Sequence, residues 1–184
     1  RDLTLSGATL TASGKMGYGL EFDGSDDFAW DENGWDVDMD TDWSMEAWIN
    51  LDDGSNEDGT IIFIGELDGS GASNELSWTI RDAGGAADGK GEMQICYNTC
   101  TSSNREDTTA ANLEADQWYH VAVTYEASVS DVDFYVNNLR IEEDSNFAIG
   151  TFSENDIVLG ESDMDYQTNT MGPCPKIHGY VQRR

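Results

Sequence analysis

The chain is poor in basic residues, and it has no long apolar run. Nine lysines and arginines stand against 37 aspartates and glutamates among 184 residues, a formal net charge of −28. Such a surface repels nucleic acid and anionic membranes, so we expect neither as a partner. No run approaches the ~18 apolar residues of a membrane span and no signal peptide is recognisable, so we expect a soluble domain, mature or cut from a longer chain.

Cysteine is also scarce, with three residues in the chain. Cys96 and Cys100, in the stretch CYNTC, are close enough to form a small disulfide-closed loop in an oxidising compartment, and we predict that bond. Two free thiols are the first alternative. A zinc site is the second, although it needs further Cys or His nearby. Cys174 is then left over, either free or paired with another chain.

Proline is nearly absent (2 residues), whereas glycine is abundant (19), and the short apolar runs are broken by Gly, Asp, Asn and Ser. This pattern favours many strands joined by turns. Alternation of apolar and polar residues predicts strands over 60–67, 75–80, 92–97, 118–126, 131–138, 139–143 and 156–160. We therefore predict an all-β fold, a two-sheet antiparallel jelly-roll sandwich, in a single domain over residues 1–184.

Two stretches refine the strand prediction. In FYVNNLRI, Asn137 and Asn138 tolerate the positive φ of a two-residue type I′ turn, so a hairpin is expected there. The acidic stretch 35–51 does not fit an EF-hand, because the sixth and twelfth positions counted from Asp36 hold Thr41 and Ala47. Its period of two predicts a pair of strands with an acidic outer face.

The stretch WYHVAVTYE, residues 118–126, contains His120 within a predicted strand. Alternation places Tyr119, Val121, Val123 and Tyr125 on one face, and Trp118, His120, Ala122 and Thr124 on the other. The sequence offers no nucleophile and acid that would make His120 catalytic. We expect a structural or surface role for this histidine, and we expect Trp48, Trp78 and Trp118 to pack in the core or between layers.

Four motifs in order resemble laminin-G-like domains: GLEFDGSDDFAW (19–30), WSMEAWINLDDG (43–54), WYHVAVTYE with VDFYVNNLRI, and DIVLGES (156–162). Such domains belong to the concanavalin A-like lectin/glucanase superfamily, which includes the pentraxins. The resemblance covers roughly residues 3–182. It implies a concanavalin A-like jelly roll, secreted or on the cell surface and without catalysis. The C-terminal stretch KIHGYVQRR departs from the family pattern, with His178 at the position of an acid.

The resemblance also implies a calcium site in the loop GESDMDY after the strand DIVL. A similar position in pentraxins carries calcium ligands, which here are Glu161, Asp163 and Asp165, with Asn74 from a second loop. Ser73 departs from the family's Asp-Asn pair, and Asp68 is placed to compensate. A solvated acidic loop without calcium is the alternative. The stretch FDGSDDF (22–28) is a second acidic candidate, which we interpret as a turn.

Sugar recognition requires aromatic platforms and polar groups. Trp30 and Trp35 flank the polar loop DENG, and Tyr166 follows the acidic loop, so these three are the candidate glycan contacts. We predict a non-catalytic extracellular recognition module that binds a glycan or an extracellular protein, with possible self-assembly. The alternative is a structural subunit or decoration of an extracellular filament, shell or surface layer. A family-16-like glycoside hydrolase is third, because ESDMD only partly matches the Glu-x-Asp-x-(x)-Glu pattern.

Overall fold

A computed structural model describes the chain in several stretches. These are residues 3–23, 26–31, 39–51, 59–65, 75–82, 91–98, 104–109, 111–144, 146–150, 156–160 and 178–179. The strands are β1 (Thr4–Ser6), β2 (Thr9–Gly14), β3 (Gly17–Glu21), β4 (Phe28–Asp31), β5 (Trp43–Asn50), β6 (Gly59–Ile64), β7 (Leu76–Asp82), β8 (Gly91–Tyr97), β9 (Arg105–Asp107), β10 (Trp118–Glu126), β11 (Asp131–Val136), β12 (Leu139–Asp144), β13 (Ile157–Leu159) and β14 (His178–Gly179). Within these stretches no helix is long and apolar enough to cross a membrane.

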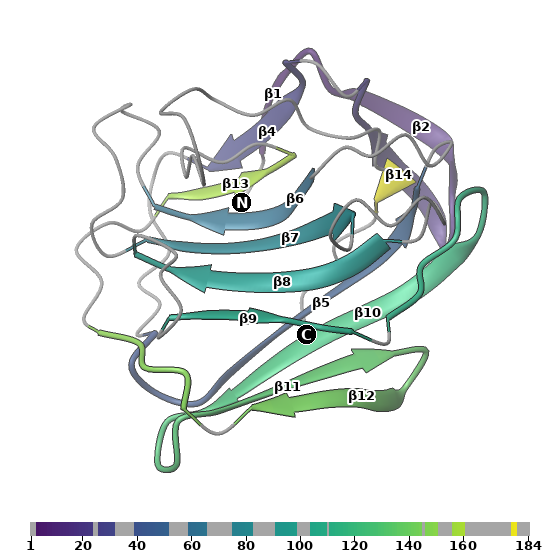
Figure 1. Ribbon diagram of the computed structural model, residues 1–184. Coiled ribbons are helices and arrows are strands. Elements are labelled where there is room, and N and C mark those ends of the chain that lie inside the picture. The colour runs from purple at the N-terminus through teal and green to yellow at the C-terminus, as the bar shows by residue number, and fades with distance from the viewer. Residues whose placement is uncertain are drawn as a thin grey trace.

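The strands form three antiparallel sheets. A seven-stranded sheet has the order β1-β4-β13-β6-β7-β8-β9, a four-stranded sheet has the order β12-β11-β10-β5, and a three-stranded sheet has the order β14-β3-β2. In Figure 1 the strands β13 to β9 of the large sheet run across the view one above another, and β5 and β10 run diagonally to them. The all-β antiparallel sandwich predicted from the sequence is confirmed; the prediction that residues 1–184 form one domain stays a prediction.

The core lies between the seven-stranded and four-stranded sheets. Each strand contributes alternate residues, because side chains of a strand point to opposite faces. From the large sheet come Leu76, Trp78, Ile80, Met93 and Ile95; from the small one come Ala47, Ile49, Val121, Val123 and Phe134, all buried in one cluster. Tyr125 belongs to the same cluster and Tyr119 packs against it, so the predicted division of 118–126 into two faces is confirmed, and the row with these tyrosines is the inner one.

Two hairpin predictions have different outcomes. Asn137 and Asn138 join β11 to β12 with φ of 50° and 67°, as the type I′ turn requires. The strand pair predicted over 35–51 is only half confirmed. Its second strand is β5, with Ala47 and Ile49 facing inward, but Met39 and Asp40 lie in a turn. Residues 35–38 lie outside the described part of the chain. The first four strands were not predicted.

The prediction that Trp48 and Trp118 pack between the layers is wrong. Both are half-buried and lie outside the core cluster, on the outer face of the four-stranded sheet. His120 pairs directly with Trp48 across β10 and β5, and its ring therefore shares that outer face. Trp78 lies in the core, as predicted, with no exposed surface. Periodicity separates the two faces of a strand, but it does not say which face is covered.

Candidate functional site

The outer face of the seven-stranded sheet carries a row of polar side chains. Ser77, Thr79 and Arg81 alternate along β7 with the core residues Leu76, Trp78 and Ile80. Across the strands they pair, in this order, with Cys96, Gln94 and Glu92 on β8. We call this surface the polar face; it comprises Phe28, Trp30, Phe63, Ser77, Thr79, Arg81, Glu92, Gln94, Cys96, Arg105, Asp107 and Val158.

One end of the polar face is aromatic. The rings of Phe28 and Trp30 on β4 lie 4.9 Å apart and are tilted by 36°. Both are half-buried and pack against a small cluster of Phe63, Cys96 and Val158, which is separate from the main core. Trp30 was a predicted glycan contact, and its half-buried ring on an outer face suits that role.

The middle of the polar face is hydrophilic but buried. Ser77, Thr79 and Gln94 have at most 2% of their surface exposed. The hydroxyl of Thr79 has no hydrogen-bond partner. A buried polar atom without a partner costs on the order of 1–3 kcal/mol. These three side chains are buried and therefore not accessible to a ligand, and direct contacts are left to the half-buried and exposed side chains at the two ends of the face.

The other end of the polar face is charged. Asp107 on β9 accepts a hydrogen bond from the Gln94 side chain. Arg105 Nε lies 3.0 Å from one oxygen of Asp107, and an Arg81 nitrogen lies 4.0 Å from the other. Two of the nine basic residues of the chain therefore flank one carboxylate. Guanidinium and carboxylate groups of this kind can bind the hydroxyls of a sugar.

Glu106, next to Asp107, belongs to the inner side of β9. Burial, followed by a hydrogen bond and repulsion from Asp144, raises the pKa of Glu106 from 4.5 to about 8. β9 and β12 are edge strands of different sheets, so this pair of carboxyl groups joins the edges of the two layers. Thr109 and Glu142 form a second contact there, with the Thr109 hydroxyl 3.3 Å from Glu142 Oε2.

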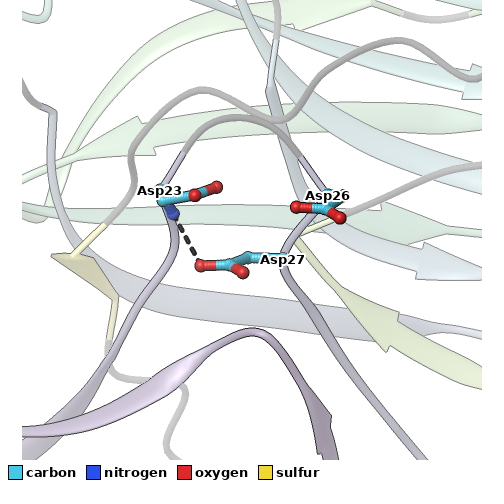
Figure 2. A group of neighbouring side chains, drawn as sticks. All are labelled: Asp23, Asp26 and Asp27. Carbon is cyan, nitrogen blue, oxygen red and sulfur yellow. Dashed lines mark hydrogen bonds between the residues drawn. The ribbon is translucent and has the colours of Figure 1, made fainter.

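A cluster of three aspartates lies just before β4. Ligand oxygens of Asp23, Asp26 and Asp27 all lie within 4.8 Å of one another. Figure 2 shows the three carboxylates turned toward a common space, with the Asp23 backbone N–H donating to Asp27 over 2.8 Å. Gly7 passes so close that a Cβ there would collide with the Asp27 carboxylate. The stretch 22–28, interpreted above as a turn, thus also gathers carboxylates.

Most of the site residues predicted from the sequence lie outside the described residues. These are the metal candidates Asp68, Asn74, Glu161, Asp163 and Asp165, and the aromatic candidates Trp35 and Tyr166. Cys96 is fully buried at the edge of the aromatic end, whereas Cys100 is not described, so the Cys96–Cys100 disulfide stays a prediction.

Sequence reasoning missed Ser77, Thr79, Gln94 and Asp107. A signal for three of them was present in ELSWTI and EMQICY, where small or polar residues alternate with apolar ones. The alternation predicted the strands, but it was not used to predict that the polar side chains of both strands share one face of the sheet. Asp107 lies in a three-residue strand that carries no such pattern.

Solved structures of similar fold include sugar-binding domains. Domain 4 of an extracellular GH43 arabinanase from Geobacillus stearothermophilus, in complex with arabinotriose, is 17% identical, with a TM-score of 0.58 over 97% of this chain and 82% of that one. The CBM40 domain of the Ruminococcus gnavus IT-sialidase, bound to α2,3-sialyllactose, is 12% identical, with a TM-score of 0.54 over 97% and 89%. At such identities the likeness establishes the fold.

A third similar structure is longer than this chain. The binding domain of Paraclostridial Mosquitocidal Protein 1 is 11% identical, with a TM-score of 0.63; the match covers 98% of this chain but 42% of that one. No curated protein matches the sequence. Residues 22–173 match the family described as the concanavalin A-like lectin/glucanases superfamily. This match spans most of the sequence and agrees with the sandwich architecture, so the chain belongs to that superfamily.

Proposed function

We propose that this chain is a non-catalytic glycan-binding module that acts outside the cell, and that the glycan binds on the polar face. The observation that carries the proposal is that this face has accessible groups of two kinds: a half-buried aromatic pair at one end, and an Arg-Asp-Arg group with half-buried or exposed side chains at the other end. Sugars have apolar faces that stack on aromatic rings and hydroxyls that need donors and acceptors.

The similar structures support the ligand class. Two of them contain a bound oligosaccharide, arabinotriose in one and sialyllactose in the other. The arabinanase is described as extracellular, which supports the same location for this module. The sugar itself is not specified by the fold, because the side chains of the polar face are particular to this chain.

The absence of catalysis is supported by the roles of two carboxylates on the polar face. Glu92 accepts hydrogen bonds from the Thr108 hydroxyl and the Ala111 backbone N–H, both over 2.9 Å. Asp107 is engaged by Gln94 and Arg105. A retaining glycosidase needs two carboxyl groups that are available to the scissile bond. Here Glu92 is buried and committed to structural partners, so Asp107 is the one carboxylate among the named residues of the polar face that a sugar can reach.

Calcium is part of the proposal. Two oxygens bound to one calcium at about 2.4 Å each lie at most about 4.8 Å apart, so the spacing of Asp23, Asp26 and Asp27 fits a shared ion. The cluster directly precedes Phe28 and Trp30 on β4, and an ion there would fix the start of the strand that carries the aromatic pair. The loop with Glu161, Asp163 and Asp165, together with Asp68 and Asn74, stays a second calcium candidate.

A glycan array probed with the protein in calcium and again in chelator tests this function. Selective binding to a small set of glycans supports the recognition module, and loss in chelator supports the role of calcium. The absence of binding together with concentration-dependent assembly favours the structural subunit. Release of reducing sugar favours the hydrolase.

A further inference from the structure

The first three strands leave an apolar surface exposed at one edge of the sandwich. β1 is the outermost strand of the seven-stranded sheet, and β2 is the outermost strand of the three-stranded sheet. Both are purple strands in the upper part of Figure 1. Five of the seven large apolar side chains that are exposed in the described residues come from this region: Leu3, Leu5, Leu10, Met16 and Tyr18.

Three of these exposed side chains lie on the same sheet faces as residues that belong to the core or pack against it. Leu5 pairs with Ala29, a fully buried core residue, so Leu5 faces the interior side of its sheet although 42% of it is exposed. Leu10 pairs with Leu20, which packs against the core, and Tyr18 shares the face of Leu20 because it is two residues away. Leu10 and Tyr18 are nevertheless 65% and 63% exposed. Apolar rows of the core therefore extend to solvent-exposed side chains on β1, β2 and β3.

This surface is also nearly free of acidic residues, with Glu21 at the end of β3 as the exception. Residues 3–20 contain no Asp or Glu and one Lys, in a chain with 37 acids. β14, which pairs with β3, belongs to a second stretch without acids, residues 166–184. Two copies of a chain with a net charge of −28 repel each other over most of their surface. At this edge their strands can approach with few like charges in the contact.

The unpaired backbone of the edge strands is a second reason to expect association at this surface. Among the described strands, none pairs with the outer side of β1 or of β2, so each presents unpaired N–H and C=O groups. An open edge of this kind can pair with another strand, and charge, proline, a short strand or a β-bulge opposes that pairing. β1 has three residues, and the β2–β3 register shifts between Thr11 and Gly14. Neither β1 nor β2 contains a charged residue or a proline.

We propose that the surface formed by β1, β2 and β3 is an interface between two copies of this chain, in which Leu5, Leu10 and Tyr18 of one copy pack against those of the other. An isologous contact uses the same patch on both copies and closes at the dimer. A dimer carries two polar faces, so binding to a polymeric glycan gains avidity without any new sugar contact. The interface itself does not depend on the proposed glycan function.

Sedimentation velocity over a range of protein concentrations tests the proposal, in about 0.1 M and about 2 M sodium chloride. We expect a monomer–dimer equilibrium that shifts toward dimer in high salt, because screening removes the long-range repulsion. Leu10→Asp places a charge in this nearly acid-free surface and should weaken the dimer at least about tenfold, roughly 1.4 kcal/mol. Tyr18→Ser should weaken it in the same direction without adding a charge.

Leu139→Asp is the matched control, because Leu139 is 71% exposed and begins another edge strand, β12. It should leave the dimer unchanged, and circular dichroism of each variant checks that the fold persists. A protein that stays monomeric in high salt at every concentration overturns the proposal. So does a dimer that Leu139→Asp weakens as much as Leu10→Asp does, or an open series of larger species in place of a dimer.

Discussion

Trp48 and His120 face each other across β5 and β10, with ring centroids 5.2 Å apart and planes inclined by 52°. Lys15 Nζ lies 5.4 Å from the Trp48 ring centroid, and His120 Nε2 lies 3.4 Å from Glu46 Oε2. The His120 backbone N–H donates to Asn137 over 3.0 Å. The histidine is thus held by neighbours on the outer face of the sheet, in the structural or surface role predicted for it.

Because Trp78 lies in the core and Trp48 on an outer face, the two should contribute differently to the free energy of unfolding. Trp78→Ala should lower the free energy of unfolding by about 3–5 kcal/mol, because it removes a fully buried ring. Trp48→Ala should cost about 1–2 kcal/mol, since Trp48 loses only outer-face contacts. Trp78→Phe should cost less than Trp78→Ala, because the buried indole N–H has no hydrogen-bond partner to lose. Chemical denaturation measures all three; equal losses for Trp48→Ala and Trp78→Ala would place Trp48 in the core.

The sandwich was predictable because its strands carry strong local signals. The row of Val121, Val123 and Tyr125, and the turn at Asn137 and Asn138, are encoded within a few residues of each other. The placement of Trp48 and Trp118 was not encoded in this way. Which face of β5 and β10 is covered depends on the position of the second sheet, and that is set by contacts distant in sequence.

The candidate site was predicted only in part, for a related reason. Trp30 was predicted as a glycan contact because it lies beside a polar loop in the sequence. Gln94 and Asp107 meet across β8 and β9, and their hydrogen bond depends on the register of those strands. Asp23, Asp26 and Asp27 were visible as an acidic run, but the close approach of Gly7, which confines Asp27, comes from a preceding loop. Local sequence patterns show which residue types are present, but the pairing of strands decides which of these residues meet in space.

The carboxyl pair of Glu106 and Asp144 predicts a pH dependence of stability. The pKa of Glu106 is raised from 4.5 to about 8 in the folded protein, chiefly by burial and then by Asp144. Between these values the folded state holds a proton that the unfolded state has released, so stability falls as the pH rises through this window. Glu106→Gln keeps a neutral group and should flatten that part of the curve.

Denaturation midpoints measured across this pH range check the effect. Glu126→Gln, the same change at an exposed position at the end of β10, is the control and should follow the original protein. The assignment to Glu106 fails if the curve of Glu106→Gln runs parallel to that of the original protein.

The disulfide prediction concerns Cys96, which is fully buried in β8. Peptide mapping under non-reducing conditions should recover Cys96 linked to Cys100, with Cys174 free or linked to another chain. The bond closes a very small loop, so we expect a modest effect on stability. A peptide that links Cys174 to either of the other two cysteines would replace this assignment.

Calcium should raise the melting temperature if the aspartate cluster holds an ion. Binding to the folded state alone stabilises by about 2.7 kcal/mol at a hundredfold excess over Kd. Magnesium should do less, because it requires a tighter octahedral site. Asp26→Asn should abolish most of the calcium shift if the ion lies at Asp23, Asp26 and Asp27, whereas Asp163→Asn should abolish it if the ion lies in the loop after β13.

Two controls accompany this experiment. Sodium chloride at matched ionic strength screens repulsion without coordination. Asp40→Asn removes a charge from an exposed turn distant in sequence from both acidic groups. Neither acidic group is a calcium site if salt alone reproduces the shift, or if both Asp26→Asn and Asp163→Asn leave the calcium effect intact.

The most direct measurement is a calorimetric titration of the glycan with the strongest array signal into the protein and three variants. Trp30→Ala removes the aromatic end of the polar face and Asp107→Asn removes the carboxylate at its charged end. Each should weaken binding at least about tenfold, roughly 1.4 kcal/mol. Trp118→Ala, on the outer face of the four-stranded sheet, should leave the affinity unchanged. Loss of binding in Trp118→Ala, with full affinity in Trp30→Ala and Asp107→Asn, would contradict the assignment of the glycan site to the polar face.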